Sequence, residues 1–346
     1  MTPAPGADAI GAPTAPAIET EGLTRVFRTR REREVQALRG LDLRVERGEC
    51  FGLLGPNGAG KSTLIKILTT LLLPTAGRAL VAGFDVASEP LSVRRRINLV
   101  SGGDSSGYGI LTVRETLHLF ARFYGVPWPV AKRRAEDLME ITGLGPKADT
   151  RMSGLSTGMK QKVNFARGFM SDPEIIFLDE PTLGLDVEAS RAIRAFIASW
   201  VRERPERTVL LTTHYMVEAD ELCGRVAIID HGTILALDTP RALKRALPDE
   251  SVFVLQVASA PPEGWGTSLD GVRSALQHTH HGSGAVELRL QLSEDHVIGE
   301  VLADLRRREI SVLNLSKHEP SLESVFIHLV GRGLEEADAA VGAEAS

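Results

Sequence analysis

The fold of this chain is decided by one short stretch of its sequence, Gly55-Pro56-Asn57-Gly58-Ala59-Gly60-Lys61-Ser62-Thr63. The stretch matches the pattern G-x-x-x-x-G-K-[ST], in which glycines let the backbone curl so that successive N–H groups point at one phosphate. In this pattern Lys61 reaches the terminal phosphates, and the Ser62 hydroxyl is a ligand for Mg²⁺. A glycine-rich turn can match the pattern by chance, so the neighbouring sequence decides the interpretation.

The residues on either side of this loop have the expected character. The apolar run 50–54 is typical of a short buried strand, and residues 63–68 are typical of a helix. The N-terminus of that helix would add its partial positive charge to a phosphate site. A strand, a glycine-rich turn and a helix in this order predict that the chain binds a nucleoside triphosphate.

Length and composition limit the possible partners. The 346 residues are enough for two domains, and the 43% apolar and 25% charged residues are ordinary for a globular protein. A net charge of −5 argues against nucleic acid as the main partner. No apolar run approaches the ~20 residues that span a bilayer. We therefore predict a cytosolic protein that contacts the membrane only through a partner, with Cys50 and Cys223 as core residues rather than a disulfide.

Changes in pattern along the chain predict its organisation. Residues 18–240 alternate strands with helices, which indicates an α/β domain with a largely parallel sheet, although the stretch 90–159 is mostly helical by periodicity. Residues 241–334 predict a smaller α/β appendage, with strands at 251–257, 285–292 and 311–315 and helices at 297–308 and 322–330. The Ala/Pro/Gly-rich residues 1–17 and the Ala/Glu-rich residues 335–346 are predicted to be disordered tails.

Two acidic residues follow a second predicted buried strand at 175–178. At the carboxyl end of such a strand, where α/β sheets place ligands, Asp179 is positioned to hold Mg²⁺ and Glu180 to act on the attacking water. The alternative is an acidic strand end that caps the next helix. His214, after the predicted strand at 209–213, is a third candidate as a polar sensor of the γ-phosphate, although a lone histidine at a strand end is usually structural.

A further helix start predicts a second copy of the chain. Ser156 and Gly158 open a helix within the stretch 155–161, so its exposed N–H groups can bind an anion. The phosphates of this chain already have the loop 55–63. The economical explanation is that this helix start serves the nucleotide of another subunit, although on its own the segment is only a capped helix.

Taken together, these residues resemble the ATP-binding-cassette (ABC) ATPases. Residues 18–240 carry the family's motifs in order: GPNGAGKST as Walker A, LSTGMKQ as the signature, IIFLDEP as Walker B, PTLGLD as the D-loop and TTH as the switch histidine. The resemblance implies a P-loop cassette with a parallel-sheet core, an antiparallel edge sheet and a helical subdomain. It also implies that two copies sandwich two ATP molecules head to tail.

The resemblance assigns further roles to individual residues. Ser156 and Gly158 would contact the γ-phosphate bound to the partner, Asp186 lies in the D-loop, and Phe27 stands where the family places an aromatic ring on adenine. Glu180, His214 and Lys61 would be catalytic, with ATP and Mg²⁺ as cofactors. The implied partners are an integral-membrane permease and a second copy of the chain, with no nucleic acid, at the inner face of the cell membrane.

The sequence also departs from the family pattern. The signature reads LSTGM rather than LSGGQ, the D-loop reads LGLD rather than SALD, and the Q-loop position falls on Gly103, with no glutamine nearby. Water or Asp104 could replace that glutamine, or the site could be weakened. Glycine-containing Q-loops, LSTGM signatures and the ending at 321–332 occur together in bacterial drug-exporter ATPases resembling daunorubicin-resistance proteins. The resemblance therefore implies export of a drug, antibiotic or lipid-like compound, with a soluble non-transport ABC ATPase or a weakly active regulatory ATPase as alternatives.

Overall fold

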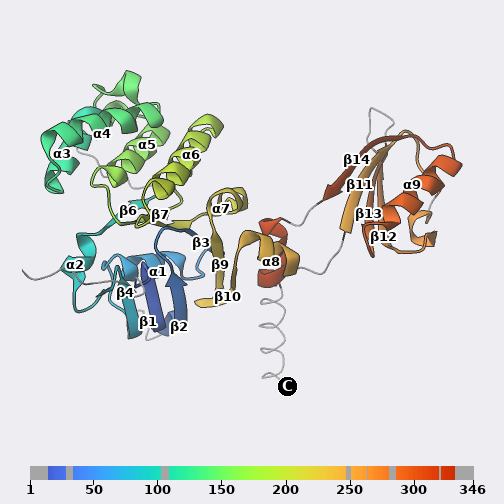
Figure 1. Cartoon of the computed structure of the whole chain (residues 1–346), viewed down its shortest axis with the longest axis horizontal. Coiled ribbons are helices and arrows are strands. Elements are labelled where there is room, and N and C mark those ends of the chain that lie inside the picture. The colour runs from blue at the N-terminus through green and yellow to red at the C-terminus, as the bar shows by residue number, and fades with distance from the viewer. Residues whose placement is uncertain are drawn as a thin grey trace, which may run out of the picture. The chain divides into compact units, whose positions relative to one another are not determined.

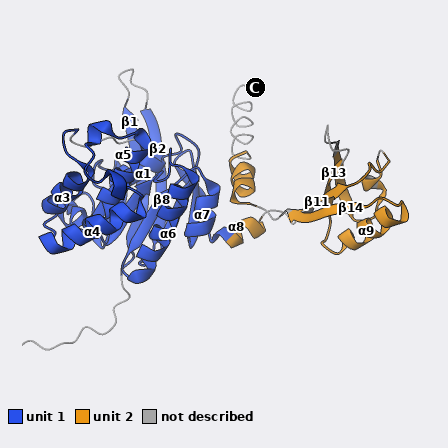
Figure 2. Cartoon of the chain, turned by 90° about the horizontal axis from the view of Figure 1, so that it is seen from above, with its two compact units in different colours: residues 1–240 blue, residues 241–346 orange. Residues whose placement is uncertain are grey.

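The computed structural model describes residues 15–28, 34–102, 109–246, 251–262, 264–279, 286–318 and 321–331. The chain divides into two compact units, Met1–Pro240 and Arg241–Ser346, which Figure 2 shows in different colours. Each unit has its own apolar core and is described by itself. Ala17 is already part of the first core, since its side chain is buried and its N–H donates to the Val45 carbonyl at 2.9 Å.

The centre of the first unit is a sheet in the order β10-β9-β3-β8-β7-β6. The strands from β9 to β6 run parallel, and β10 is antiparallel to β9. Their bounds are β3 Cys50–Leu54, β6 Ile97–Ser101, β7 Ile175–Asp179, β8 Thr208–Thr212, β9 Arg225–Asp230 and β10 Thr233–Asp238. Every residue of β3 and β8 is buried, as expected for strands covered on both faces. The carboxyl ends of β3, β8 and β7 therefore lie side by side at one edge.

A second, antiparallel sheet has the order β2-β1-β4-β5. Its strands are β1 Ile18–Arg28, β2 Glu34–Val45, β4 Ala76–Val81 and β5 Phe84–Asp85. Arg28 pairs with Glu34 in the antiparallel β1–β2 register, and residues 29–33 between them lie outside the described residues. Apolar side chains of both sheets meet those of the first helix in one core cluster.

Seven labelled helices of the first unit connect or cover these sheets in Figure 1. They are α1 Lys61–Leu68, α2 Pro90–Arg94, α3 Val113–Phe123, α4 Trp128–Ile141, α5 Thr157–Phe169, α6 Val187–Glu203 and α7 Met216–Leu222. Thr112 and Glu115 form a reciprocal capping box at the start of α3, and the side chains of Ser156 and Asp186 cap α5 and α6. Helices α3, α4 and α5 pack on one another as a helical subdomain.

The structure refines one prediction in this unit and corrects another. The stretch 90–159 is mostly helical, but within it residues Ile97–Ser101 form the edge strand β6. Val100 there is fully buried, and pairing with β7 satisfies the backbone of the short apolar run. Helix α1 begins at Lys61 rather than at residue 63, so the phosphate-loop lysine is already helical. Cys50 and Cys223 are free and buried, with their Sγ atoms 3.9 Å apart.

The second unit is built on an antiparallel sheet in the order β12-β13-β11-β14. Its elements are α8 Pro240–Ala246, β11 Ser251–Val257, β12 Val272–Thr279, β13 Val286–Leu292, α9 Val297–Arg307 and β14 Val312–His318, followed by a helix over 322–331. Alternate residues of β13 are buried, and they pack with Val301 and Leu305 of α9 in a separate core. Strand β12 was not predicted, because its polar residues interrupt the apolar alternation.

Candidate active site

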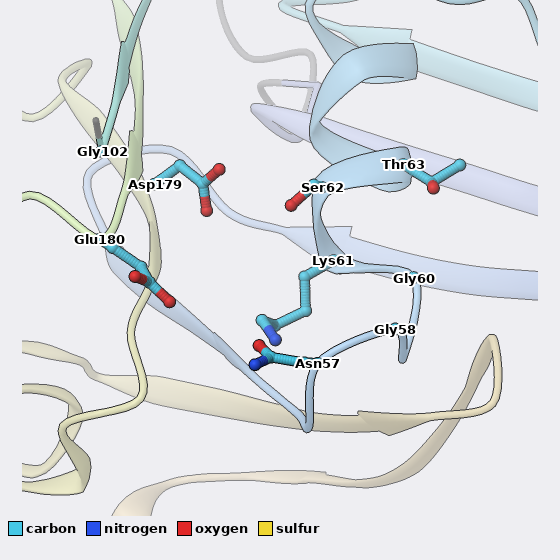
Figure 3. A pocket seen from close by; sticks show the side chains of 9 residues that line it. All are labelled: Asn57, Gly58, Gly60, Lys61, Ser62, Thr63, Gly102, Asp179 and Glu180. Atoms are coloured by element: carbon cyan, nitrogen blue, oxygen red, sulfur yellow. The ribbon is translucent and has the colours of Figure 1, made fainter. Parts of the chain in front are cut away.

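A cavity of about 330 Å³ lies where the phosphate loop meets the end of β7. Figure 3 shows its lining residues, which are Asn57, Gly58, Gly60, Lys61, Ser62, Thr63, Gly102, Asp179 and Glu180. The side chains of Lys61 and Ser62 come from the start of α1 and face those of Asp179 and Glu180 across the cavity. Residues far apart in the sequence therefore form one site with a basic side and an acidic side.

The loop reaches this geometry because two glycines permit it. Gly60 has φ +111°, and a Cβ there would lie 2.6 Å from the Ala37 carbonyl oxygen. A Cβ on Gly55 would lie 2.3 Å from the Ile229 carbonyl oxygen, so the turn out of β3 passes directly against β9. Only glycine fits this approach without displacing backbone. The turn aims the N-terminus of α1 and its N–H groups into the cavity.

Lys61 is fixed at the centre of this loop. Its side chain is buried, and Nζ donates to the carbonyl oxygens of Gly55 at 2.7 Å and Pro56 at 2.9 Å. Burial lowers the pKa of Lys61, and the carboxylates of Glu180 and Asp179 oppose that shift. A phosphate would supply the further negative charge that favours the ammonium form.

Asp179 ends β7 with its carboxylate directed into the cavity. The hydroxyl of Thr212, at the end of the neighbouring strand β8, donates to Asp179 Oδ1. Ser62 and Asp179 are hard oxygen donors of the kind that Mg²⁺ prefers, and Mg²⁺ usually takes one or two carboxylates together with substrate phosphates. In the described ranges no group of three or more His, Cys, Asp or Glu side chains could hold a metal alone. Ser62 and Asp179 thus fit a metal that arrives with a nucleotide.

Glu180 and His214 form a pair beside this position. His214 Nδ1 lies 3.3 Å from Glu180 Oε1, and the histidine ring packs against Tyr215 with centroids 4.0 Å apart. Glu180 has φ +53°, a left-handed conformation that costs a non-glycine residue about 1–3 kcal/mol and clusters at functional sites. The Glu180 N–H donates to the Thr212 carbonyl at 2.9 Å, which supports that conformation.

The remaining predicted site residues lie away from the cavity. Ser156 caps α5 by accepting from the Met159 N–H at 3.3 Å, and a Cβ on Gly158 would lie 3.2 Å from the Gly184 carbonyl oxygen. Asp186 caps α6, and the Ala189 N–H that donates to it at 2.7 Å lowers the pKa of its carboxyl group. The structure therefore brings the signature helix and the D-loop together, but not to the phosphate loop of the same chain.

Two further positions singled out by the sequence, Phe27 and the Q-loop position Gly103, are not among the described residues that line the cavity. Phe27 lies at the end of β1 and does not line the cavity; its side chain is 37% exposed, and the Arg25 guanidinium lies 4.7 Å from the ring centroid. Gly103 and Asp104, at the expected Q-loop position, lie outside the described residues, whereas the adjacent Gly102 lines the cavity. Sequence reasoning missed the contact of Thr212, for which the run Thr212-Thr213 before the histidine was the available signal.

The arrangement can bind a triphosphate and hydrolyse it. The loop presents Lys61 to a phosphate, and the oxygen donors Ser62 and Asp179 line the same cavity. The Glu180 carboxylate also lines it and can act on a water beside the phosphate. No described helix is both long enough and apolar enough to cross a membrane. The fold and the cavity define a P-loop nucleoside-triphosphate hydrolase.

Comparison with known proteins narrows that class. A family model described as ABC transporter matches residues 38–183. The chain is 37% identical over 328 residues to the daunorubicin/doxorubicin resistance ATP-binding protein DrrA of Streptomyces peucetius, an alignment that covers 95% of this chain and 96% of that protein. The chain therefore belongs to the ABC transporter family, and it is an ATP-binding, ATP-hydrolysing subunit.

Two further matches agree with this assignment. The linearmycin resistance ATP-binding protein LnrL of Bacillus subtilis (strain 168) is 33% identical over 304 residues, which cover 86% of this chain and 95% of that protein. A solved dimeric structure of the ATP-binding cassette MJ0796, in a post-hydrolysis state with ADP and Pi, matches with a TM-score of 0.59 and 25% identity. That match covers 64% of this chain and 98% of the other. The predicted ABC cassette fold is confirmed.

Proposed function

We propose that this chain is the ATPase subunit of an antibiotic exporter, acting as a homodimer with a separate permease at the inner face of the cell membrane. The observation that carries the proposal is the cavity in which Lys61 and Ser62 face Asp179 and Glu180. The export direction and the substrate class are supported by relatives named for resistance to daunorubicin, doxorubicin and linearmycin.

Binding begins at the phosphate loop. The N–H groups at the N-terminus of α1 and the Lys61 ammonium surround the β- and γ-phosphates of ATP. Ser62 and Asp179 would hold Mg²⁺, which would neutralise charge on the phosphate oxygens. Thr212 would keep Asp179 in the orientation that this role needs, because its hydroxyl donates to one carboxylate oxygen. The partly exposed ring of Phe27 is the proposed platform for adenine.

Hydrolysis depends on Glu180. Its carboxylate lines the cavity on the side opposite Lys61 and accepts the proton of the attacking water as general base. His214, 3.3 Å from Glu180 Oε1, holds that carboxylate and contacts the γ-phosphate. The left-handed backbone at Glu180 sets the direction in which the carboxylate leaves the strand end.

The second half of each site comes from another copy of the chain. Ser156 and Gly158 stand at the N-terminus of α5, where N–H groups and the helix dipole attract an anion. Neither residue lines the cavity of its own chain. A head-to-tail dimer would bring this helix start to the γ-phosphate of the partner and place Asp186 at the junction.

Dimer formation can be tested with a slow-hydrolysis variant. In a Glu180→Gln background, ATP should convert the full-length chain from monomer to dimer in size-exclusion chromatography with light scattering. Gly158→Asp should abolish this conversion, because it adds a negative charge where phosphate is to bind. Gly154→Asp is the matched control, since a Cβ there meets only the Thr150 Cγ2, at 3.8 Å. Equal dimerisation of both aspartate variants would contradict the proposed partner site.

The helical subdomain is the proposed contact with the permease. Large apolar side chains there are unusually exposed, at 66% for Phe123, 56% for Trp128 and 78% for the preceding Ile110. Co-expression with a candidate membrane permease should raise cellular resistance to doxorubicin, and Glu180→Gln should remove that resistance. Resistance that persists with Glu180→Gln would contradict ATP-driven export.

A further inference from the structure

Glu218 is a buried carboxylate with no role in the ATPase chemistry proposed above. It lies in α7, and the residue is 3% exposed. A buried carboxylate is costly unless hydrogen bonds satisfy it. Both oxygens of Glu218 are occupied: Oε1 accepts from the Thr182 hydroxyl, and Oε2 accepts from the Thr213 hydroxyl at 2.8 Å. Arg194 Nη1 of α6 lies 3.8 Å from Oε1 and balances the charge.

The two threonines belong to the two loops that carry the proposed reacting groups. Thr182 follows Glu180 in the loop after β7, and Thr213 immediately precedes His214 in the loop after β8. Glu218 therefore joins the loop that carries Glu180 to the loop that carries His214 through one hydrogen bond to each. The Thr213 hydroxyl also accepts from the Tyr215 N–H at 3.0 Å, so the same contact fixes the backbone on both sides of His214.

A second bridge links the same loops closer to the cavity. The Glu180 N–H donates to the Thr212 carbonyl at 2.9 Å, and His214 Nδ1 lies 3.3 Å from Glu180 Oε1. The strained φ of +53° at Glu180 persists only where its surroundings hold it. Two loops joined at only one point could rotate about it, whereas two joined at separate points keep their spacing.

We propose that Glu218 is a positioning residue for ATP hydrolysis, which sets the distance between the Glu180 carboxylate and His214 by binding both loops at once. The inference rests on the proposed roles of Glu180 and His214. Glu218 itself is not among the residues that line the cavity. Its removal should slow the chemical step while leaving ATP binding intact, because its hydrogen bonds run to Thr182 and Thr213 rather than to the phosphate loop.

The chain provides a matched control on the same helix. Glu221 also pairs with Arg194, with its Oε2 at 2.8 Å from Nε, but its side chain is 53% exposed and neither threonine donates to it. In full-length protein, Glu218→Gln should lower kcat about 10- to 100-fold, the range expected when a catalytic group is misplaced by up to ~1 Å. The KM for ATP should stay within about 2-fold, and Glu221→Gln should leave both constants within that margin.

Variants of Thr213 test the same contact with little change in volume. Thr213→Val removes the donor and should reproduce the loss in kcat, whereas Thr213→Ser keeps the hydroxyl and should retain activity. In the Glu180→Gln background, Glu218→Gln should add little further loss, because it acts through Glu180. The Thr213 pair also covers the case in which Glu218→Gln does not fold.

Four results would overturn the inference. The first is an unchanged kcat in Glu218→Gln or Thr213→Val, and the second is a fall in kcat that Glu221→Gln matches. The third is a fall in kcat accompanied by a comparable fall in ATP affinity and by lower thermal stability. The fourth is a fall in kcat from Glu218→Gln that is as large in the Glu180→Gln background as in wild type. If Glu180→Gln itself keeps the wild-type rate, the proposed catalytic role of Glu180 falls and this inference falls with it. If only Glu180→Gln is impaired, the proposed function stands and the role of Glu218 is wrong.

Discussion

A methyl group added at Gly55 should disable the phosphate loop, and the structure gives the size of the effect. In Gly55→Ala the new Cβ would lie 2.3 Å from the Ile229 carbonyl oxygen, 2.8 Å from Ile229 Cγ2 and 3.1 Å from Ala59 Cβ. Non-bonded carbon atoms prefer a separation of about 3.5–4.0 Å, and all three of these contacts are shorter than that. The turn must therefore move by about 1 Å, and the nearest atom is backbone that cannot rotate away.

Overpacking of this severity typically costs about 1–3 kcal/mol of folding free energy. The same displacement moves the loop N–H groups relative to the phosphates, and each 1.4 kcal/mol lost in binding weakens affinity about tenfold. We therefore expect ATP affinity to fall about 10- to 100-fold in Gly55→Ala, together with a lower urea midpoint at an unchanged slope.

Urea unfolding followed by tryptophan fluorescence and titration with a fluorescent ATP analogue measure the two effects. Gly224→Ala is the control, because nothing lies within 4 Å of its Cβ position and its backbone is not left-handed. It should be neutral or stabilising by up to about 1 kcal/mol. If Gly55→Ala kept both the wild-type midpoint and the wild-type ATP affinity, the close approach of the loop to β9 would be refuted as the reason for glycine.

Three further predictions concern the same cavity. Lys61→Ala should weaken ATP binding at least about 10-fold by isothermal titration, whereas Lys66→Ala, an exposed position on the same helix, should not. Burial lowers the pKa of Lys61, so just below the ordinary value of 10.5 the unfolded chain binds more protons than the folded chain. The stability of wild type should therefore rise relative to that of Lys61→Met as pH approaches 10.5. A stability difference that does not change with pH across this window would contradict the lowered pKa. Thr212→Val should raise the Mg²⁺ concentration for half-maximal ATPase activity about 10-fold, the effect typical of losing a hydrogen bond to a metal ligand, and Thr212→Ser should not. If wild type and Thr212→Val needed the same Mg²⁺ concentration, Thr212 would not orient Asp179.

Local sequence was sufficient for the phosphate loop and for the strand that ends at Asp179. Both depend on residues next to one another in the chain. The phosphate loop is a glycine pattern that follows the apolar run 50–54, and Asp179 and Glu180 are an acidic pair that follows the apolar run 175–178. The resemblance to ABC ATPases added the antiparallel edge sheet and the helical subdomain, which periodicity alone does not give. The family matches confirm that assignment.

Contacts between distant segments could not be predicted in this way. Strand β6 was assigned to a helical region because its short apolar run is ambiguous until it pairs with β7. Glu218 sits in the charged stretch MVEADEL, which is typical of a solvent-exposed helix face, and only the fold brings it under Thr182 and Thr213. The Thr212 contact with Asp179 likewise depends on the pairing of β7 with β8.

Phosphate release from bound ATP by the full-length chain in a single turnover tests the central claim most directly. Glu180→Gln should release phosphate about 10²- to 10⁴-fold more slowly than wild type, the range for loss of a general base, while binding ATP with similar affinity. Glu188→Gln, an exposed position in α6, should match wild type. Equal rates of phosphate release from full-length wild type and Glu180→Gln in this assay would contradict the assignment of this cavity as the hydrolytic site.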